Sequence, residues 1–416
     1  MRVPYLLSLG YEGEEERIAK NMKRYVIETT SYTLSTAIST NLVNALAMRY
    51  MGYGIVEIGA LTLLRTAAVS VGSVAALPLL ERYRRERLRV WLLFGTVNRV
   101  GWALTALAPL LPPPLNHATL LGVVASAQLA GAIAGVASMD TLADNVRPSV
   151  AGKFFGAVAS LNNLATLLAF LLTLLAFRLL SPEWAYASLY SLALATALLS
   201  TWSLATLKDF FPKESRELDL KGAMRGYAEV LVKDVSSGRF IALSNAFTFA
   251  VHVPSAFWDY YVVRVMGGDE TWLTVKNIAN MALKSLSLKL WSSYLNIIGA
   301  RRSVLASMFS TAPIPVLYTS SDSLMALVGV NVYASIAWTP WEIANTLYTM
   351  YLVPESKRPS FVSAQNVASN AVATIGTGFG VLVASISGVT SAFVISSLLR
   401  AAVALLSVRW MPELER

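Results

Sequence analysis

Several residue types are scarce or missing in this chain of 416 residues. It contains no cysteine, which excludes disulfides, thiol catalysis and cysteine-ligated metal sites. It contains two histidines, His117 and His252, so a histidine metal cluster is not expected, and neither is a bound cofactor. Charged residues make up 14% of the chain, whereas a soluble domain has about 25%. That shortage leaves too little polar surface to cover a soluble globule of this size.

Long apolar segments are present instead. Hydrophobic residues account for 55% of the chain, and the mean hydropathy is +0.54. Helices are the only plausible form in which segments of this length can span a bilayer, because lipid offers no partners for backbone groups. The sequence therefore predicts an all-α polytopic membrane protein with about twelve transmembrane helices. We place these spans at 25–47, 57–80, 89–111, 118–138, 153–176, 185–205, 240–263, 272–295, 303–319, 324–350, 361–384 and 389–409.

The positive charges are distributed unevenly among the loops. The net charge is +9, and 25 of the 34 Lys and Arg residues fall in alternate loops, at the span ends beside those loops and in the two termini. The opposite loops hold only Arg49, Arg178 and Arg264, and the remaining six basic residues lie inside apolar segments. Because Lys and Arg are retained on the cytoplasmic side, this skew predicts a cell-membrane protein with both termini in the cytoplasm. The excess charge is better explained by contact with anionic lipids than by nucleic acid.

One long polar connector divides the spans into six and six. Residues 206–239 contain Pro212 and the charged run KESRELDLK. Within the connector, residues 222–234 fit either an amphipathic helix on the inner membrane surface or a flexible tether. The predicted order is a cytoplasmic segment 1–24, a six-helix bundle 25–205, the connector 206–239, a second bundle 240–409 and a cytoplasmic tail 410–416.

The two bundles show signs of duplication. The second span is followed by Glu81-Arg-Tyr-Arg-Arg-Glu-Arg-Leu-Arg89, and the eighth is followed by Asn296-Ile-Ile-Gly-Ala-Arg-Arg-Ser-Val304. Pro148 and Pro354 hold matching positions after the fourth and tenth spans. A repeated set of six helices predicts two pseudo-symmetric bundles, which is typical of transporters with a central site between related halves.

At these loops the chain resembles the major facilitator superfamily over essentially its whole length. That family carries a basic loop, G-x-L-x-D-R-x-G-R-R, between helices two and three, and a weaker copy between helices eight and nine. In this sequence Glu81 stands at the acid position of the first copy, and both glycines are replaced. In the second copy Asn296 stands at the acid position. The resemblance implies alternating access, in which two bundles rock around a site facing helices one, four, seven and ten.

The paired loops are candidates for a conformational latch. An acid at a helix end can pair with bases and helix N-termini of the neighbouring bundle in one state only. The alternative is that the basic loop merely orients the spans. The candidate latch residues are Glu81, Arg82, Arg85, Gly299, Arg301 and Arg302.

Two features are not typical of proton-driven multidrug exporters. The fourth span contains Ala127-Gln-Leu-Ala-Gly131, where proton-coupled members of the superfamily often have Arg four residues before the Gly. The fifth span lacks the Gly-Pro-Gly-Gly signature of drug–proton antiporters. Both features weaken that assignment without excluding it.

Ionisable and amide side chains inside the spans are the candidates for solute binding, because such groups are costly within a membrane. Counting along the predicted spans places Arg99 and Lys284 near the midplane and no clear acid there. That imbalance predicts an anionic or zwitterionic small solute; the alternative is that these bases pair with acids across helices. The candidate binding residues are Arg99, Gln128, His252, Asn280, Lys284 and Trp338.

Proton coupling requires an acid or a histidine that changes charge between states. The candidates are Glu28, Asp259, Glu342 and His252. We expect Glu28 near the inner end of the first span and Asp259 at the same depth as Lys276, with which it could pair. If none of these groups couples a proton, a facilitative uniporter is favoured.

Other classes of function are less well supported. The chain has no G-x-x-x-x-G-K-[ST] loop, so a solute or ion gradient is the expected driving force. Gly376-Thr-Gly-Phe-Gly380 is expected to serve helix packing rather than nucleotide binding. A metabolite or drug exporter, a non-transporting receptor and a lipid scramblase stay open as alternatives, whereas a membrane enzyme is disfavoured by the single intramembrane histidine. The expected partners are a small solute, membrane lipids and protons, and the expected state is a monomer.

Overall fold

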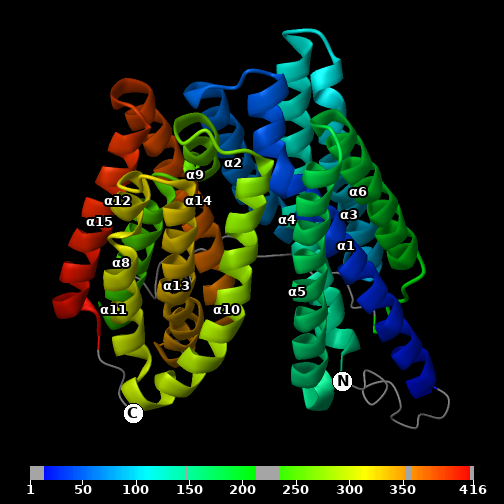
Figure 1. The fold of residues 1–416 in the computed structure, drawn as a ribbon. Helices are drawn as coiled ribbons and strands as arrows, with labels where there is room; N and C mark the ends of the chain where they lie inside the picture. Colours follow the sequence, from blue (N-terminus) through cyan, green and yellow to red (C-terminus); the bar gives the residue numbers. More distant parts are fainter. Residues whose placement is uncertain (1–13, 147, 212–234, 353–357, 413–416) are drawn as a thin grey trace. The chain divides into compact units, whose positions relative to one another are not determined.

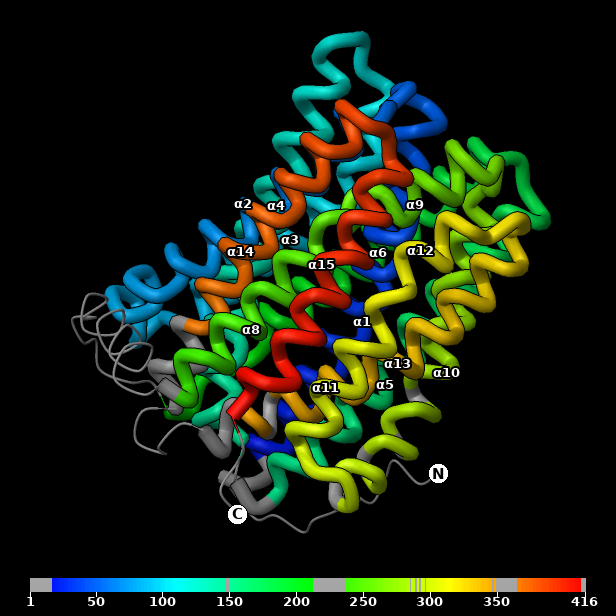
Figure 2. The backbone as a smooth tube through the Cα atoms, turned by 90° about the vertical axis from the view of Figure 1, so that its left-hand side faces the viewer, coloured from blue at the N-terminus to red at the C-terminus, as the bar shows by residue number. Residues whose placement is uncertain are grey.

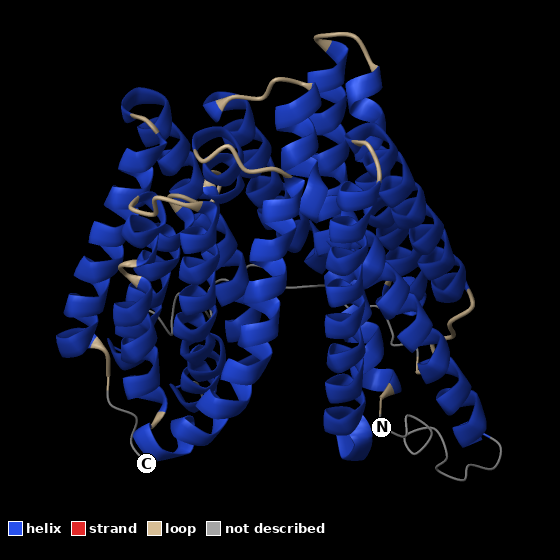
Figure 3. Ribbon diagram, in the orientation of Figure 1, coloured by secondary structure: helices blue, strands red, loops and turns tan. Residues whose placement is uncertain are grey.

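The computed structural model describes residues 14–146, 148–211, 235–352 and 358–412, and every regular element in those ranges is helical (Figure 3). The chain forms two compact units. The first comprises Met1–Leu46 and Val71–Leu218, and the second comprises Ala47–Ser70 and Asp219–Arg416. Two helices at the start of the chain, α1 (Glu14–Tyr50) and α2 (Ile55–Arg82), which Figure 1 labels, are each divided between the units. Residues 222–234, expected to form either an amphipathic helix or a flexible tether, lie outside the described residues.

The first unit consists of the first part of α1, the last part of α2 and four further long helices. They are α3 (Arg87–Leu104), α4 (Leu115–Asn145), α5 (Pro148–Leu179) and α6 (Pro182–Ala205), with short segments η2 (Arg84–Glu86) and η3 (Thr105–Leu110) flanking α3. Helix α3 packs against both α4 and α6. Small residues allow the close approach, since a Cβ added at Gly101 would lie 3.0 Å from the Cβ of Ala127.

The second unit contains the remaining helices. They are α8 (Val235–His252), α9 (Trp258–Tyr260), the π-helix η4 (Tyr261–Val265), α10 (Glu270–Ile298), α11 (Ala300–Thr311), α12 (Ile314–Thr319), α13 (Leu324–Leu352), α14 (Arg358–Ser387) and α15 (Val389–Trp410). A bidentate ion pair ties the end of α1 into this unit, because Arg49 donates to both carboxylate oxygens of Glu270 at 2.7 Å.

Two helices of the second unit are interrupted at prolines. Helix α8 ends at His252, two residues before Pro254. Helix α11 ends at Thr311 and α12 begins after Pro313, so the predicted span 303–319 is two short helices rather than one. Proline lacks an amide hydrogen, which leaves a carbonyl group one turn earlier without its helical donor.

Helix α15 supplies hydroxyl groups to carbonyl groups at both interruptions. It lies alongside α8, α11 and α12 and is red in Figure 2. Ser396 donates a 2.7 Å hydrogen bond to the carbonyl of Ala250, whose helical donor position is occupied by proline. Ser397 donates to the carbonyl of Ala312 at 2.7 Å and accepts from the amide of Val316 at 3.2 Å. The hydroxyl of Ser397 therefore bridges the two backbone groups, Ala312 carbonyl and Val316 amide, that would bond to each other in a continuous helix.

The glycine-rich stretch of α14 lies directly against α8. A Cβ added at Gly376 would approach the carbonyl oxygen of Phe249 to 2.7 Å, and one added at Gly380 would approach that of Val253 to 1.7 Å. These contacts require residues without side chains. The predicted role of this stretch in helix packing is confirmed.

Eight helices in the described part of the chain are long and apolar enough to cross a membrane. They are α2, α3 with its flanking segments, α4, α5, α6, α13, α14 and α15. Large apolar side chains such as Leu164 and Leu175 on α5 are exposed, as expected for a surface in contact with lipid. The chain is thus an all-helical, multi-pass membrane protein, while twelve spans in two six-helix bundles stay a prediction.

Candidate functional site

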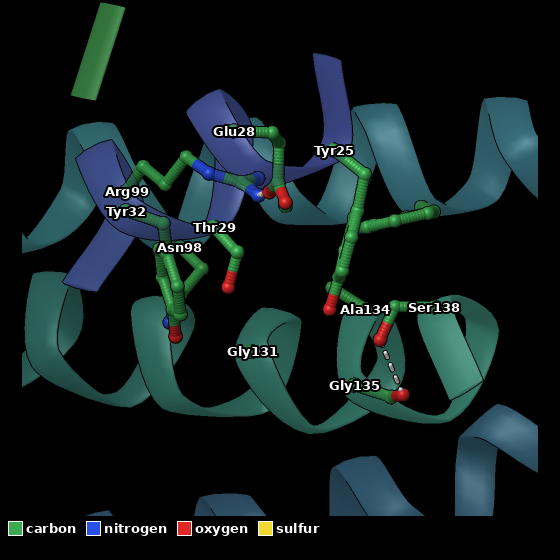
Figure 4. Close-up of a pocket in the computed structure, with 12 residues that line it drawn as sticks. Tyr25, Glu28, Thr29, Tyr32, Asn98, Arg99, Gly131, Ala134, Gly135 and Ser138 are labelled. Atoms are coloured by element: carbon green, nitrogen blue, oxygen red, sulfur yellow. Dashed lines mark hydrogen bonds and ion pairs between the residues drawn. The ribbon is translucent and has the colours of Figure 1, made fainter. Parts of the chain in front are cut away.

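A cavity of about 110 Å³ lies within the first unit among α1, α3 and α4. Its lining residues are Tyr25, Glu28, Thr29, Tyr32, Trp91, Gly95, Asn98, Arg99, Gly131, Ala134, Gly135 and Ser138. In Figure 4, Arg99 reaches toward Glu28, while Thr29 and Tyr25 point toward the small residues of α4. The small residues of α4 leave the space into which these polar groups project.

A buried ion pair forms one wall of this cavity. Arg99 of α3 donates through Nη2 to the carboxylate of Glu28 on α1, and each side chain is 3% exposed. Ser200 of α6 accepts a 2.8 Å hydrogen bond from Arg99 Nε and donates to the backbone carbonyl of Glu28 at 2.9 Å. The guanidinium carbon also lies 4.9 Å from the ring centre of Tyr32, a cation–π contact. Three helices thus hold the pair in place.

The remaining terminal nitrogen of Arg99, Nη1, has no hydrogen-bond partner among the described residues although it is buried. It lies against Gly95, where an added Cβ would be only 2.1 Å away. Asn98 is fitted in a similar way, because a Cβ on Gly131 would lie 2.4 Å from its amide nitrogen. The two glycines therefore make room for polar side chains at the cavity wall.

The expected shortage of acids near these bases is wrong. Arg99 is paired with Glu28, and Lys284 on α10 lies 2.7 Å from the carboxylate of Glu342 on α13. The depth of Glu28 in the membrane was predicted by counting from the start of the first span at residue 25. Helix α1 begins earlier, at Glu14, so Glu28 lies well inside its helix. The pairing of bases with acids across helices, left open as an alternative, is what the structure contains.

A third pair was anticipated correctly. Lys276 on α10 donates a 2.8 Å hydrogen bond to Asp259 on α9, and the lysine is 7% exposed. Asp259 follows the break after α8, so the interruption carries this acid toward α10. The expected contact is confirmed, although any role in proton coupling stays a prediction.

The other candidate binding residues do not line this cavity. In the first unit Gln128 is half-buried on α4 and does not line the cavity that Arg99 lines. In the second unit His252 bonds the carbonyl of Thr248 in its own helix at 2.8 Å. Trp338 packs on Phe247, with ring centres 5.9 Å apart, and Asn280 is half-buried on α10.

Sequence reasoning missed Arg87, which pairs with three acids. Its side chain is 0% exposed and bonds the carboxylates of Asp140 (2.9 Å), Asp144 (2.5 Å) and Asp209 (2.7 Å). Burial raises the pKa of Asp209, but hydrogen bonds from Arg87 and Asn145, together with the charge of Arg87, lower it overall below its ordinary value. The four-residue spacing of Asp140 and Asp144 at the end of α4 was the available signal.

The candidate latch residues lie at the expected helix ends. Glu81 is 3.4 Å from Arg84 of its own loop, and Arg82 and Arg85 are exposed. In the second unit Arg301 donates to the backbone carbonyl groups of Val408 and Met411 at 2.9 and 3.1 Å. The last two candidates are Gly299, which caps α11 with φ +81°, and Arg302, which is exposed. A latch between bundles stays a prediction.

The fold and the buried ion pair place the chain among helical membrane proteins with charged groups inside the apolar region. Solved structures define the fold more closely. The chain matches the nucleoside transporter NupG with a TM-score of 0.72 and 13% identity, covering 94% of this chain and 99% of that one. It matches the inward-open xylose transporter XylE from E. coli with a TM-score of 0.66 and 14% identity, covering 95% and 97%.

A third match is a bacterial homologue of the iron transporter ferroportin in an inward-facing state, with a TM-score of 0.71 and 13% identity, covering 95% of this chain and 99% of that one. No protein-family model matches the sequence, and no curated protein matches it. The matches show that the chain has the fold of the major facilitator superfamily, which confirms the resemblance seen in the sequence.

Proposed function

We propose that this chain is a secondary membrane transporter that moves a small solute by alternating access. The observation that carries the proposal is the buried Glu28–Arg99 pair at the wall of a cavity inside apolar helices. Ionisable groups in a membrane are expensive, and apolar side chains of similar volume would pack a helix interface at no such cost. A pair that also lines a cavity is better explained by solute handling than by packing.

The proposed location is the cell membrane. The proposed topology is twelve spans in two six-helix bundles, with both termini in the cytoplasm. The eight apolar helices and the skew of basic residues support it. The structural counterparts are, by name, transporters of nucleosides, xylose and iron, which supports a transporter of small solutes without indicating which solute.

The proposed solute is anionic or zwitterionic, and the proposed driving force is a proton gradient. Arg99 beside the cavity supports the first part, since its free Nη1 is a donor without a partner among the described residues. Glu28 supports the second, as an acid at the same wall. A facilitative uniporter or a drug or metabolite exporter would use the same fold, and a receptor or lipid scramblase would not move the solute at all.

Flux into liposomes tests the function. A thermal-shift screen of small solutes selects ligands, and radiolabelled uptake by the full-length protein is then measured with and without a pH gradient. Accumulation against a gradient supports secondary active transport, whereas equilibration without accumulation indicates a uniporter. Ligand binding without any flux would overturn transport in favour of a receptor, and lipid movement without solute flux would indicate a scramblase.

A further inference from the structure

We propose that Glu28 and Arg99 couple one proton to one small carboxylate by exchanging partners on the guanidinium group. The solute carboxylate takes the place of Glu28 on Arg99, and Glu28 binds a proton from the same aqueous side. On release the solute leaves Arg99, the proton leaves Glu28, and the original ion pair reforms. This inference rests on the proposed transport function and adds its substrate class and its coupling stoichiometry.

The geometry of Arg99 suits this exchange. A guanidinium group can hold a carboxylate with two parallel hydrogen bonds. Glu28 uses Nη2, Ser200 takes Nε, and Nη1 is left without a partner among the described residues, beside Gly95, which lines the cavity together with Arg99. An incoming carboxylate that engages Nη1 and then Nη2 would complete the hydrogen bonds of the group and displace Glu28. Ser200 would keep the guanidinium in position throughout.

Charge balance explains why the two events would be tied together. The empty site holds one anion and one cation, and the loaded site holds neutral Glu28, cationic Arg99 and the solute anion, so both are neutral overall. Binding the solute without the proton would bury an extra negative charge, and binding the proton without the solute would leave Arg99 uncompensated. A buried charge without a partner is strongly unfavourable, so the half-loaded states are suppressed.

The surroundings of Glu28 leave it as the group that takes the proton. Ionisable neighbours are Tyr25 and Tyr32 on α1 and Arg99 on α3. The α4 residues of the lining are Gly131, Ala134, Gly135 and Ser138, none of which is ionisable, and α6 contributes Ser200. Glu28 is thus the one carboxylate among the described residues that line the cavity.

The size of the cavity limits the solute. At about 110 Å³ the cavity is small. Pockets for drug-sized ligands measure about 300–1,000 Å³. The cavity therefore suits a small monocarboxylate, for which pyruvate is a practical probe because it stays ionised and crosses lipid slowly.

The experiment follows pyruvate and protons together. Full-length protein is reconstituted in liposomes containing a trapped pH-sensitive dye, and labelled pyruvate is added with an inward proton gradient. We expect accumulation of pyruvate, one proton entering per pyruvate, and no response to an imposed membrane potential. Uridine and xylose serve as neutral probes and glycine as a zwitterionic one.

Two variants separate coupling from binding. Glu28→Gln keeps a neutral group at the acid position, so we expect pyruvate exchange across the membrane to continue while pH-driven accumulation falls about tenfold or more. Arg99→Gln is expected to lose both pyruvate exchange and pH-driven accumulation. Glu86→Gln is the matched control, because it neutralises an acid of an exposed pair with Arg89, away from the cavity, and should change neither.

The outcomes distinguish this inference from the function on which it rests. Proton-driven pyruvate accumulation by Glu28→Gln, or a response of the wild type to membrane potential, would overturn the exchange while leaving transport intact. Movement of uridine or xylose but not pyruvate would do the same. If none of the four probes moves, the exchange and the transport of such solutes fail together. Should Glu28→Gln not fold, the stoichiometry and potential measurements on the wild type decide alone.

Discussion

Arg400 of α15 donates a 3.1 Å hydrogen bond to the carbonyl oxygen of Thr311, which has no helical donor because the residue four positions on is Pro315. A second nitrogen of Arg400 reaches the carbonyl of Val251, near the end of α8, at 3.4 Å. The guanidinium carbon lies 5.7 Å from the ring centre of Trp338. One buried cation therefore joins the ends of two interrupted helices, beside the serines that serve the neighbouring carbonyls.

Replacing Arg400 should destabilise the packing of both interrupted helices. Arg400→Met removes the hydrogen bonds to two buried carbonyl groups, and we expect the free energy of unfolding to fall by about 2 kcal/mol. Thermal unfolding of the purified protein in detergent measures the change. Arg409→Met is the matched control, because Arg409 is exposed near the end of the same helix. Equal stability of the two variants would contradict this role for Arg400.

The close approach of α14 to α8 gives a second stability prediction. A Cβ at Gly380 would lie 1.7 Å from the carbonyl oxygen of Val253, so the backbone itself must shift in Gly380→Ala. Overpacking of this kind costs about 1–3 kcal/mol, and the same unfolding measurement applies. Gly329→Ala is the control, since nothing lies within 4 Å of a Cβ at that position. A Gly380→Ala protein as stable as its control would show that the helices can separate freely.

Much of the fold was readable from the sequence because apolar length and proline are local signals. Each predicted span overlaps a helix of the structure, and Pro254 marked the end of α8. The predicted pairing of Asp259 with Lys276 also succeeded, since both were placed at the same depth in adjacent spans. The break between α11 and α12 was missed although Pro313 and Pro315 mark it, because the span was placed by apolar length and the residues flanking the break are apolar.

The candidate site was harder to predict because it depends on contacts between helices. Glu28 and Arg99 are 71 positions apart, and their depths were judged from helix ends that hydropathy does not fix. Arg87 stands among other bases in its loop, and nothing local distinguishes it from exposed Arg85. Arg87 is buried because Asp144 of α4 and Asp209, after α6, pair with it. These contacts are visible only in the packed structure.

The Arg87 cluster predicts a dependence of stability on pH. The pKa of Asp209 is lowered in the folded protein, so folding favours its ionised form. Its contribution is therefore complete above the ordinary carboxyl pKa of about 3.9 and is lost as the pH falls through the lower, folded value. We expect Asp209→Asn to lower the unfolding free energy by about 1 kcal/mol near pH 7, because Arg87 keeps two other acids.

Unfolding of wild type and Asp209→Asn across a pH series measures this contribution. The difference between the two proteins should shrink as the pH drops below about 4, since protonation then removes the same charge from the wild type. Glu86→Gln is the control, because Glu86 pairs with Arg89 on an exposed surface and should change stability little. A difference that stays constant with pH would mean that the charge of Asp209 is not what stabilises the cluster.

Gly95 offers a way to move Arg99 without altering any charge. A Cβ at position 95 would lie 2.1 Å from Arg99 Nη1, which is the end of a flexible side chain, so the guanidinium must shift while the backbone need not. We expect Gly95→Ala to fold normally and to bind or transport its solute about tenfold less well, because a misplacement of this size disrupts a positioned ion pair. Gly122→Ala, with nothing within 4 Å of its Cβ, is the control for uptake and thermal unfolding. Full activity in Gly95→Ala would show that the position of Arg99 beside the cavity does not matter for solute handling, and a misfolded variant would show that the helix backbone, rather than the side chain, gives way.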